Sequence, residues 1–181
     1  MRIWLALWAI AMGFMPTIAP AAEPGAAPIP APVAALAGCW GGRGEVMGKS
    51  VSITVHAAPI VLDAMMAVDA DSVATADPND RYAAHLIFGG AGDPQKAPAS
   101  VIMGYWTDSF GGTFAAAGNG EVRADGFDMT YAYPDDAFVN RWRMKGDALS
   151  WQIVARDANG VEKPFASYAL QKAACASSAK P

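Results

Sequence analysis

The chain has 181 residues, of which 53% are hydrophobic and 17% are charged, and its net charge at pH 7 is −4. This acidic balance argues against a nucleic-acid-binding protein, which needs a basic face to displace counterions from phosphates. Beyond the N-terminus, no apolar stretch reaches the roughly 20 residues of a membrane-spanning helix, which argues against stable membrane insertion, and the length suits one domain.

The N-terminus has the pattern of a secretory signal peptide. Arg2 precedes an apolar run over residues 3–15, and the small-residue segment Ala19-Pro20-Ala21-Ala22 follows. A positive start, a short apolar core and an A-x-A-like end are typical of such peptides. The sequence therefore predicts a signal peptide over residues 1–21 and a periplasmic or secreted mature protein.

Residues 22–34 are almost entirely alanine and proline, a composition that favours an extended linker over a packed core. The last residues, 176–181, are small or polar and are expected to be a disordered tail. One folded domain is thus expected over residues 35–175.

Two cysteines, Cys39 and Cys175, lie near the two ends of this domain. An even, distant pair in an exported protein predicts a disulfide, which would tie the first structured segment to the last. The letters Leu36-Ala37-Gly38-Cys39 also match a lipoprotein acylation box. A lipid anchor at Cys39 is the less favoured alternative, because Glu23 and several prolines separate this box from the apolar run and Cys175 would lose its partner.

The domain itself has the pattern of short strands joined by tight turns. Hairpin-type dipeptides punctuate it at Asn119-Gly120, Asp125-Gly126, Gly146-Asp147 and Asn159-Gly160. Between them apolar and polar residues alternate: Phe138, Asn140 and Trp142 share one face, whereas Arg141 and Arg143 take the other. Such alternation is typical of strands with one buried face. Residues 57–76 are expected to form a strand and then a loop, and residues 89–99 a long connection.

About nine or ten such runs, all joined by short links, indicate an all-β antiparallel up-and-down barrel or a sandwich. A bond between the terminal strands favours the barrel, because closure places the first and last strands side by side and removes exposed sheet edges.

Three segments resemble a known family. They are Gly38-Cys39-Trp40, the stretch from Gly104-Tyr105-Trp106 to Gly111-Gly112, and Tyr131-Ala132-Tyr133-Pro134-Asp135. In this order they resemble an uncharacterised family of bacterial, often secreted, lipocalin-like (calycin) domains. The resemblance implies a barrel whose closed end is plugged by Trp40 after Gly38, and a cavity that can hold a small molecule.

The chain also departs from the lipocalin pattern. Lipocalins stack an arginine of the last strand over the first-strand tryptophan, whereas the last run here, residues 165–172, contains no arginine. Lys172 or an arginine from elsewhere in the chain would have to take that role. Haem-binding relatives use a histidine near the C-terminus as the iron ligand. This chain has none there, so no haem and no other cofactor is expected.

The predicted ligand pocket combines aromatic faces with a few polar groups, the usual composition of small-molecule sites. It comprises His85, Tyr105, Asp108, Tyr131, Tyr133, Asn140, Trp142 and Trp151. The leading hypothesis is a small apolar or amphipathic ligand inside the barrel, and a void above about 300 Å³ reaching the surface would favour it.

Two other functions stay open. A barrel of about eight strands can be filled by its own side chains, and would then be a structural or interaction domain of the cell envelope. The second is an enzyme using His85, Tyr105 and Asp108. No metal site is expected, because only His56 and His85 are available and the cysteines are expected to be paired. The sequence carries no signal for an oligomeric state.

Overall fold

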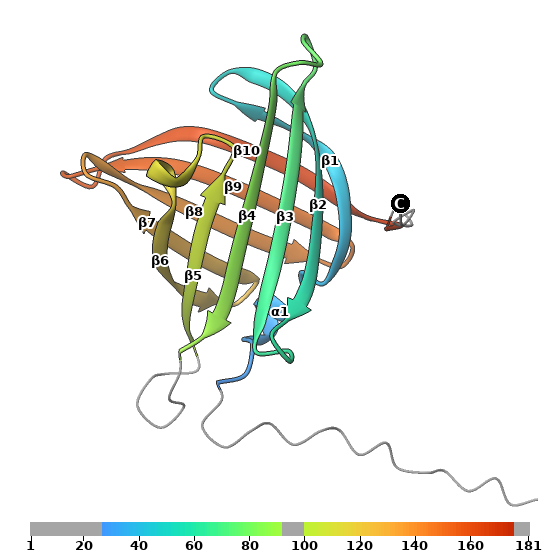
Figure 1. Ribbon diagram of the computed structural model, residues 1–181, viewed down its shortest axis with the longest axis vertical. Helices are drawn as coiled ribbons and strands as arrows, with labels where there is room; N and C mark the ends of the chain where they lie inside the picture. The colour runs from blue at the N-terminus through green and yellow to red at the C-terminus, as the bar shows by residue number, and fades with distance from the viewer. Residues whose placement is uncertain (1–26, 92–99, 176–181) are drawn as a thin grey trace, which may run out of the picture.

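Nearly all the regular structure of the chain is β-strand. The computed structural model describes residues 27–91 and 100–175 (Figure 1). Two short helices occur there, α1 (Ala31–Ala34) and the 3₁₀ turn η1 (Gly112–Phe114). The strands are β1 (Gly38–Val46), β2 (Lys49–Ile60), β3 (Met65–Ala74), β4 (Arg81–Gly90), β5 (Val101–Asp108), β6 (Ala116–Arg123), β7 (Gly126–Ala132), β8 (Asp136–Lys145), β9 (Ala148–Asp157) and β10 (Glu162–Ala173).

Each strand pairs antiparallel with the next one along the chain, and β1 pairs with β10, so the sheet closes into a ten-stranded barrel. This confirms the predicted all-β up-and-down barrel. In the seam between β1 and β10, Cys39 lies opposite Ala173 and Trp40 opposite Lys172. The predicted disulfide between Cys39 and Cys175 is also present, with the two Cα atoms 5.1 Å apart.

The predicted faces of β8 are correct. Asn140 and Trp142 are buried in the barrel interior, whereas Arg141 lies on the outer side and forms an ion pair with Glu162 of β10 at 2.7 Å. Apolar side chains at alternate positions of every strand therefore meet in one common core.

One predicted hairpin turn is wrong. Asn119 and Gly120 lie inside β6, which continues to Arg123. At Gly120 the backbones of β6 and β7 lie too close together for a side chain, because a Cβ atom at this position would be 2.0 Å from the carbonyl oxygen of Asp128 on β7. Its lack of a side chain allows the two strands to pair tightly.

The loop expected in the second part of residues 57–76 is also wrong. A four-residue turn after Ile60 leads into β3, which extends from Met65 to Ala74. The inward positions of β3 include Ala70 and Ser72. Small residues of this kind give a weak strand signal by themselves, but the pairing with β2 and β4 on both sides holds the segment extended.

The described part of the chain starts inside the expected linker. Residues 31–34 form α1, and Val33 is fully buried because its apolar side chain packs into one end of the barrel. The predicted signal peptide and C-terminal tail lie outside the described residues. Within residues 27–91 and 100–175, neither helix has the length and apolar character needed to span a bilayer.

Candidate functional site

The two ends of the barrel differ. One end is closed by the segment before β1, which includes α1 at the bottom of the view in Figure 1. Leu36 is fully buried there, and its carbonyl oxygen accepts a hydrogen bond of 2.8 Å from the Trp40 indole N–H. The Lys172 ammonium lies 4.3 Å from the centre of the Trp40 ring and donates to the Ala37 carbonyl. Lys172 thus takes the position over the Trp40 ring that an arginine has in lipocalins.

The middle of the barrel is filled by aromatic rings. Trp142 stacks on Trp151, with ring centres 4.2 Å apart, and on its other side lies parallel to Phe127 at 5.8 Å. Phe88 packs edge-on against both Phe127 and Trp142. A wide central cavity therefore does not form between these four rings.

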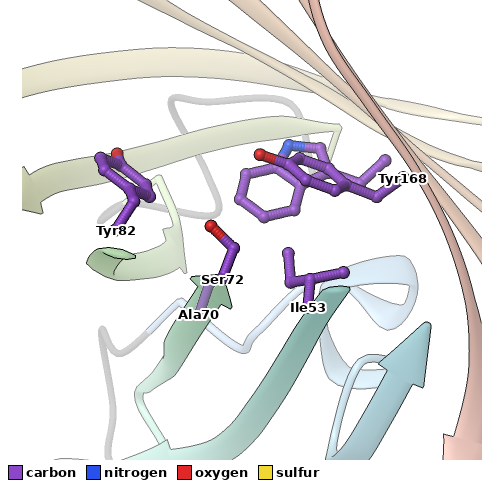
Figure 2. Close-up of a pocket in the computed structure, with 6 residues that line it drawn as sticks. Ile53, Ala70, Ser72, Tyr82 and Tyr168 are labelled. Atoms are coloured by element: carbon purple, nitrogen blue, oxygen red, sulfur yellow. The ribbon is translucent and has the colours of Figure 1, made fainter. Parts of the chain in front are cut away.

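The interior is less tightly filled in the half of the barrel nearer the opposite end, which carries the turns after β1, β3 and β5 and is termed the open end because α1 does not cover it. A narrow gap lies between side chains of β2, β3, β4, β9 and β10, and Figure 2 shows its walls. Nowhere is this gap wide enough to admit a water molecule, so the void above about 300 Å³ that would favour a ligand inside the barrel is not present here among the described residues. The gap is lined by Ile53, Ala70, Ser72, Tyr82, Trp151 and Tyr168.

Three hydroxyl groups border this gap. Ser72 lies between the rings of Tyr82 and Tyr168 (Figure 2). Burial raises the pKa of Tyr168 to about 12 and also raises the pKa of Tyr82, where the charge of Asp108 adds to the shift. Both phenols are therefore neutral at physiological pH, and each can take part in hydrogen bonds to a ligand.

Asp108, at the end of β5, accepts hydrogen bonds from three groups next to the gap. Its Oδ2 atom accepts hydrogen bonds from the Tyr82 hydroxyl at 3.1 Å and from the Trp106 indole N–H at 3.0 Å. Its Oδ1 atom accepts from the backbone N–H of Phe110 at 2.9 Å. The carboxylate therefore holds the Tyr82 ring in place. The Tyr82 hydroxyl uses its proton in this bond, so its lone pairs stay available to accept a hydrogen bond.

Three buried donors in the interior lack a hydrogen-bond partner within the described residues: the Tyr131 hydroxyl, the Asn140 amide nitrogen and the Trp142 indole nitrogen. The other end of the Asn140 amide is satisfied, because its oxygen accepts from the Trp151 indole N–H at 2.9 Å. Buried donors are nearly always paired in folded proteins, with protein or with water. The aromatic core therefore contains three hydrogen-bond donors that are free to bind a water molecule or a polar group.

The predicted pocket residues fall into three groups, and of these residues Trp151 alone lines the gap. Tyr131, Asn140, Trp142 and Trp151 are buried inside the barrel. Asp108 and Tyr133 lie at the open end, where the Tyr133 hydroxyl donates to the Phe114 carbonyl at 2.8 Å.

His85 and Tyr105 lie on the outer wall instead. Tyr105 is 55% exposed, and the Nδ1 atom of His85 is 2.7 Å from a carboxylate oxygen of Asp69. His85 and Asp108 both border a shallow surface depression of about 330 Å³, and Tyr105 is not among its lining residues. The Asp108 carboxylate is engaged with Tyr82 and Trp106, so the described structure does not join the three groups into one constellation.

Sequence analysis missed Ser72, Tyr82 and Tyr168. Ser72 lies in the segment that was expected to be a loop, so its inward orientation could not be inferred. Tyr82 and Tyr168 alternate with exposed residues on β4 and β10, and this period-two pattern was the available signal.

No protein-family model and no curated protein matches the chain. Among solved structures, the crystal structure of Rv2717c from M. tuberculosis is similar, with a TM-score of 0.59 at 15% sequence identity. The match covers 80% of this chain and 99% of the other. At this identity the likeness shows the fold alone, a β-barrel domain.

Proposed function

We propose that the protein binds a small, neutral, amphipathic molecule with a flat apolar part at the open end of the barrel. The observation that carries the proposal is the gap in the aromatic interior, which three hydroxyl-bearing residues, Ser72, Tyr82 and Tyr168, help to line. Apolar walls with a few placed polar groups are the usual composition of a small-molecule site.

The lining defines the chemistry of the ligand. All six side chains around the gap are uncharged, so a charged ligand would leave water without compensation. The Trp151 ring is stacked on Trp142 and packs against Tyr168, whose ring centre lies 4.9 Å from that of Trp151, so a ligand stacks on Trp151 only after the Tyr168 ring has moved. The Tyr82 hydroxyl already donates to Asp108 and would therefore accept a hydrogen bond from the ligand.

The size of the gap limits the ligand. As described, the gap does not admit even a water molecule, whereas ligand pockets usually enclose roughly 300–1,000 Å³. Binding therefore requires the Tyr82 and Tyr168 rings to move apart. We restrict the proposal to molecules with a single ring, because these need the smallest opening.

A panel of neutral phenols, indoles and short alcohols tests the proposal, with native mass spectrometry for retention and tryptophan fluorescence for affinity. We expect one molecule per chain. Tyr168→Phe should weaken binding by about 2- to 10-fold, the value of one hydrogen bond. Ala70→Leu should abolish binding, because the larger side chain fills the gap.

Tyr105→Phe is the matched control, since this tyrosine lies on the outer wall. Retention of no panel member by the wild-type chain would refute the proposal, and so would wild-type affinity in a folded Ala70→Leu variant.

Export of the protein belongs to the same proposal. The disulfide supports it, because disulfides persist in oxidising compartments such as the periplasm. In a bacterium with a periplasm, we expect the mature chain in the periplasmic fraction with its N-terminus near residue 22. An uncleaved chain in the cytoplasm would contradict this.

The filled interior favours a second candidate, an interaction domain mounted on the Ala/Pro segment. Large apolar side chains are exposed in the turns at the open end, on Met47, Phe110, Phe114 and Val161. A partner protein bound at this end would cover these side chains. Cross-linking in cells tests this candidate, and recovery of the monomer alone would count against it.

A further inference from the structure

The outer wall of the barrel carries three potential metal ligands at the seam. The sulfur atoms of Cys39 and Cys175 and a ring nitrogen of His56 all lie within 4.8 Å of one another. Cys39 on β1 pairs directly with His56 on β2, and Cys175 follows the end of β10. The barrel closure therefore brings together three residues from three separate segments.

This group is accessible from solvent. His56 and Cys175 are exposed and Cys39 is partly buried, so both a reductant and a metal ion can reach it. In the oxidised protein the two sulfurs are bonded to each other. The thiolate is the form of cysteine that binds metals, so the group becomes a ligand set after reduction.

We propose that reduction of the Cys39–Cys175 disulfide converts this group into a three-ligand site for a borderline or thiophilic cation such as Zn²⁺, with water in the fourth position. An external dithiol supplies two electrons and two protons: the S–S bond breaks, two thiols form, and the dithiol becomes a cyclic disulfide. Binding of the cation then releases the two thiol protons to solvent. Two thiolates and a neutral imidazole are a donor set that zinc prefers.

The two sulfurs are bonded to each other in the oxidised chain and must separate when the metal binds. Zinc–sulfur bonds of about 2.3 Å and zinc–nitrogen bonds of about 2.0 Å place tetrahedral ligand atoms roughly 3.5–3.8 Å apart. Backbone pairing between β1 and β2 holds Cys39 and His56 in place. Cys175 lies beyond the last residue of β10, so its side chain can turn to accommodate the metal without disturbing the ladder.

A carboxylate lies next to this site. Asp69 on β3 is directly opposite His56 in the register and faces the same outer side. Metal-binding histidines commonly have a carboxylate neighbour that orients the ring. Asp69 contacts His85 in the described structure, so it is a neighbour of the site and not one of its ligands.

The site is separate from the gap at the open end, and its role is distinct. It would keep the seam between β1 and β10 tied under reducing conditions, with a sulfur–metal–sulfur bridge in place of the disulfide. The protein would then respond to both the redox state and the availability of the metal.

Titration with Co²⁺, a spectroscopic substitute for Zn²⁺, tests the proposal. The full chain is compared in its oxidised form and after reduction with dithiothreitol, which is then removed by anaerobic desalting. We expect one Co²⁺ per reduced chain, with thiolate-to-cobalt charge-transfer absorption that Zn²⁺ displaces, and no such absorption for the oxidised chain.

Variants separate the ligands. His56→Ala should weaken Co²⁺ binding at least 10-fold, and Cys39→Ser with Cys175→Ser should abolish the charge-transfer absorption. His85→Ala is the matched control, because it removes the other exposed histidine, and should bind as the wild type does.

Three results would overturn the proposal. The first is the absence of charge-transfer absorption in the reduced wild-type chain. The second is equal Co²⁺ affinity in wild type and His56→Ala. The third is loss of the near-UV circular dichroism of the tryptophan stack on reduction, because the site requires β1 and β2 in register.

Discussion

Removal of the disulfide should be among the most destabilising changes in this protein that leave the interior untouched. Cys39 and Cys175 are 136 positions apart in sequence. In the loop-entropy model, cross-linking a loop of this length reduces the freedom of the unfolded chain by about 5 kcal/mol at 25 °C. We therefore expect the double variant Cys39→Ser, Cys175→Ser to lose up to about 5 kcal/mol of unfolding free energy while keeping the barrel.

Urea denaturation of the wild-type and double-variant chains measures this loss, with a chelator present so that no metal stabilises free thiols. The slope of the unfolding free energy against urea concentration (the m value) should be larger for the variant, because an unfolded chain without the cross-link exposes more surface. The reduced wild type is the control for the substitutions and should match the variant. A loss below about 1 kcal/mol would refute the reasoning, since the disulfide would then not restrict the unfolded chain as the loop-entropy model requires.

Three further predictions concern the strands and the tyrosines. Gly126→Ala should cost about 1–3 kcal/mol of unfolding free energy in urea denaturation, because its Cβ atom would lie 1.9 Å from a carbonyl oxygen of β8; Gly41→Ala, with open space around it, is the control. Lys172→Met should lower the urea midpoint by the equivalent of about 0.5–1 kcal/mol through loss of the cation over Trp40, whereas Lys172→Arg should preserve it; equal losses in both would argue against this contact. Tyr168 has a folded pKa of about 12, above the usual value of about 10, so its contribution to stability is complete below pH 10 and is lost as the pH rises through about 12. Tyr168→Phe should therefore flatten the fall in stability over this pH range, and an unchanged slope would contradict the assignment.

The sequence allowed the barrel and its closure to be predicted because both depend on local signals. Alternation on β8 placed Asn140 and Trp142 inside and Arg141 outside, and the two distant cysteines indicated which strands meet. The sequence left the cation over Trp40 open between Lys172 and an arginine from elsewhere, and the pairing of Trp40 with Lys172 across the seam decides for Lys172.

The open-end gap could not be predicted in the same way. It exists because Ala70 and Ser72 on β3 are small where Trp151 and Tyr168 cross the interior, and this match depends on side chains from strands far apart in sequence. His85 is a different case. The apolar residue beside it, Leu86, is fully buried, so alternation alone places the imidazole on the outer wall.

The position of His56 beside the cysteines required the register of β1 against β2. A shift of this register by one residue would turn the imidazole to the other face of the sheet. Composition therefore could not reveal this group.

The pairing of β1 with β10 also governs when the protein can fold. A growing polypeptide on the ribosome can form the successive hairpins from β1 onward, but β1 keeps a free edge until its last partner, which ends at Ala173, has been synthesised. The closing step therefore comes after nearly the whole chain has been made. Until then the nascent molecule is an open, unfinished sheet and is exposed to aggregation if its completion is delayed.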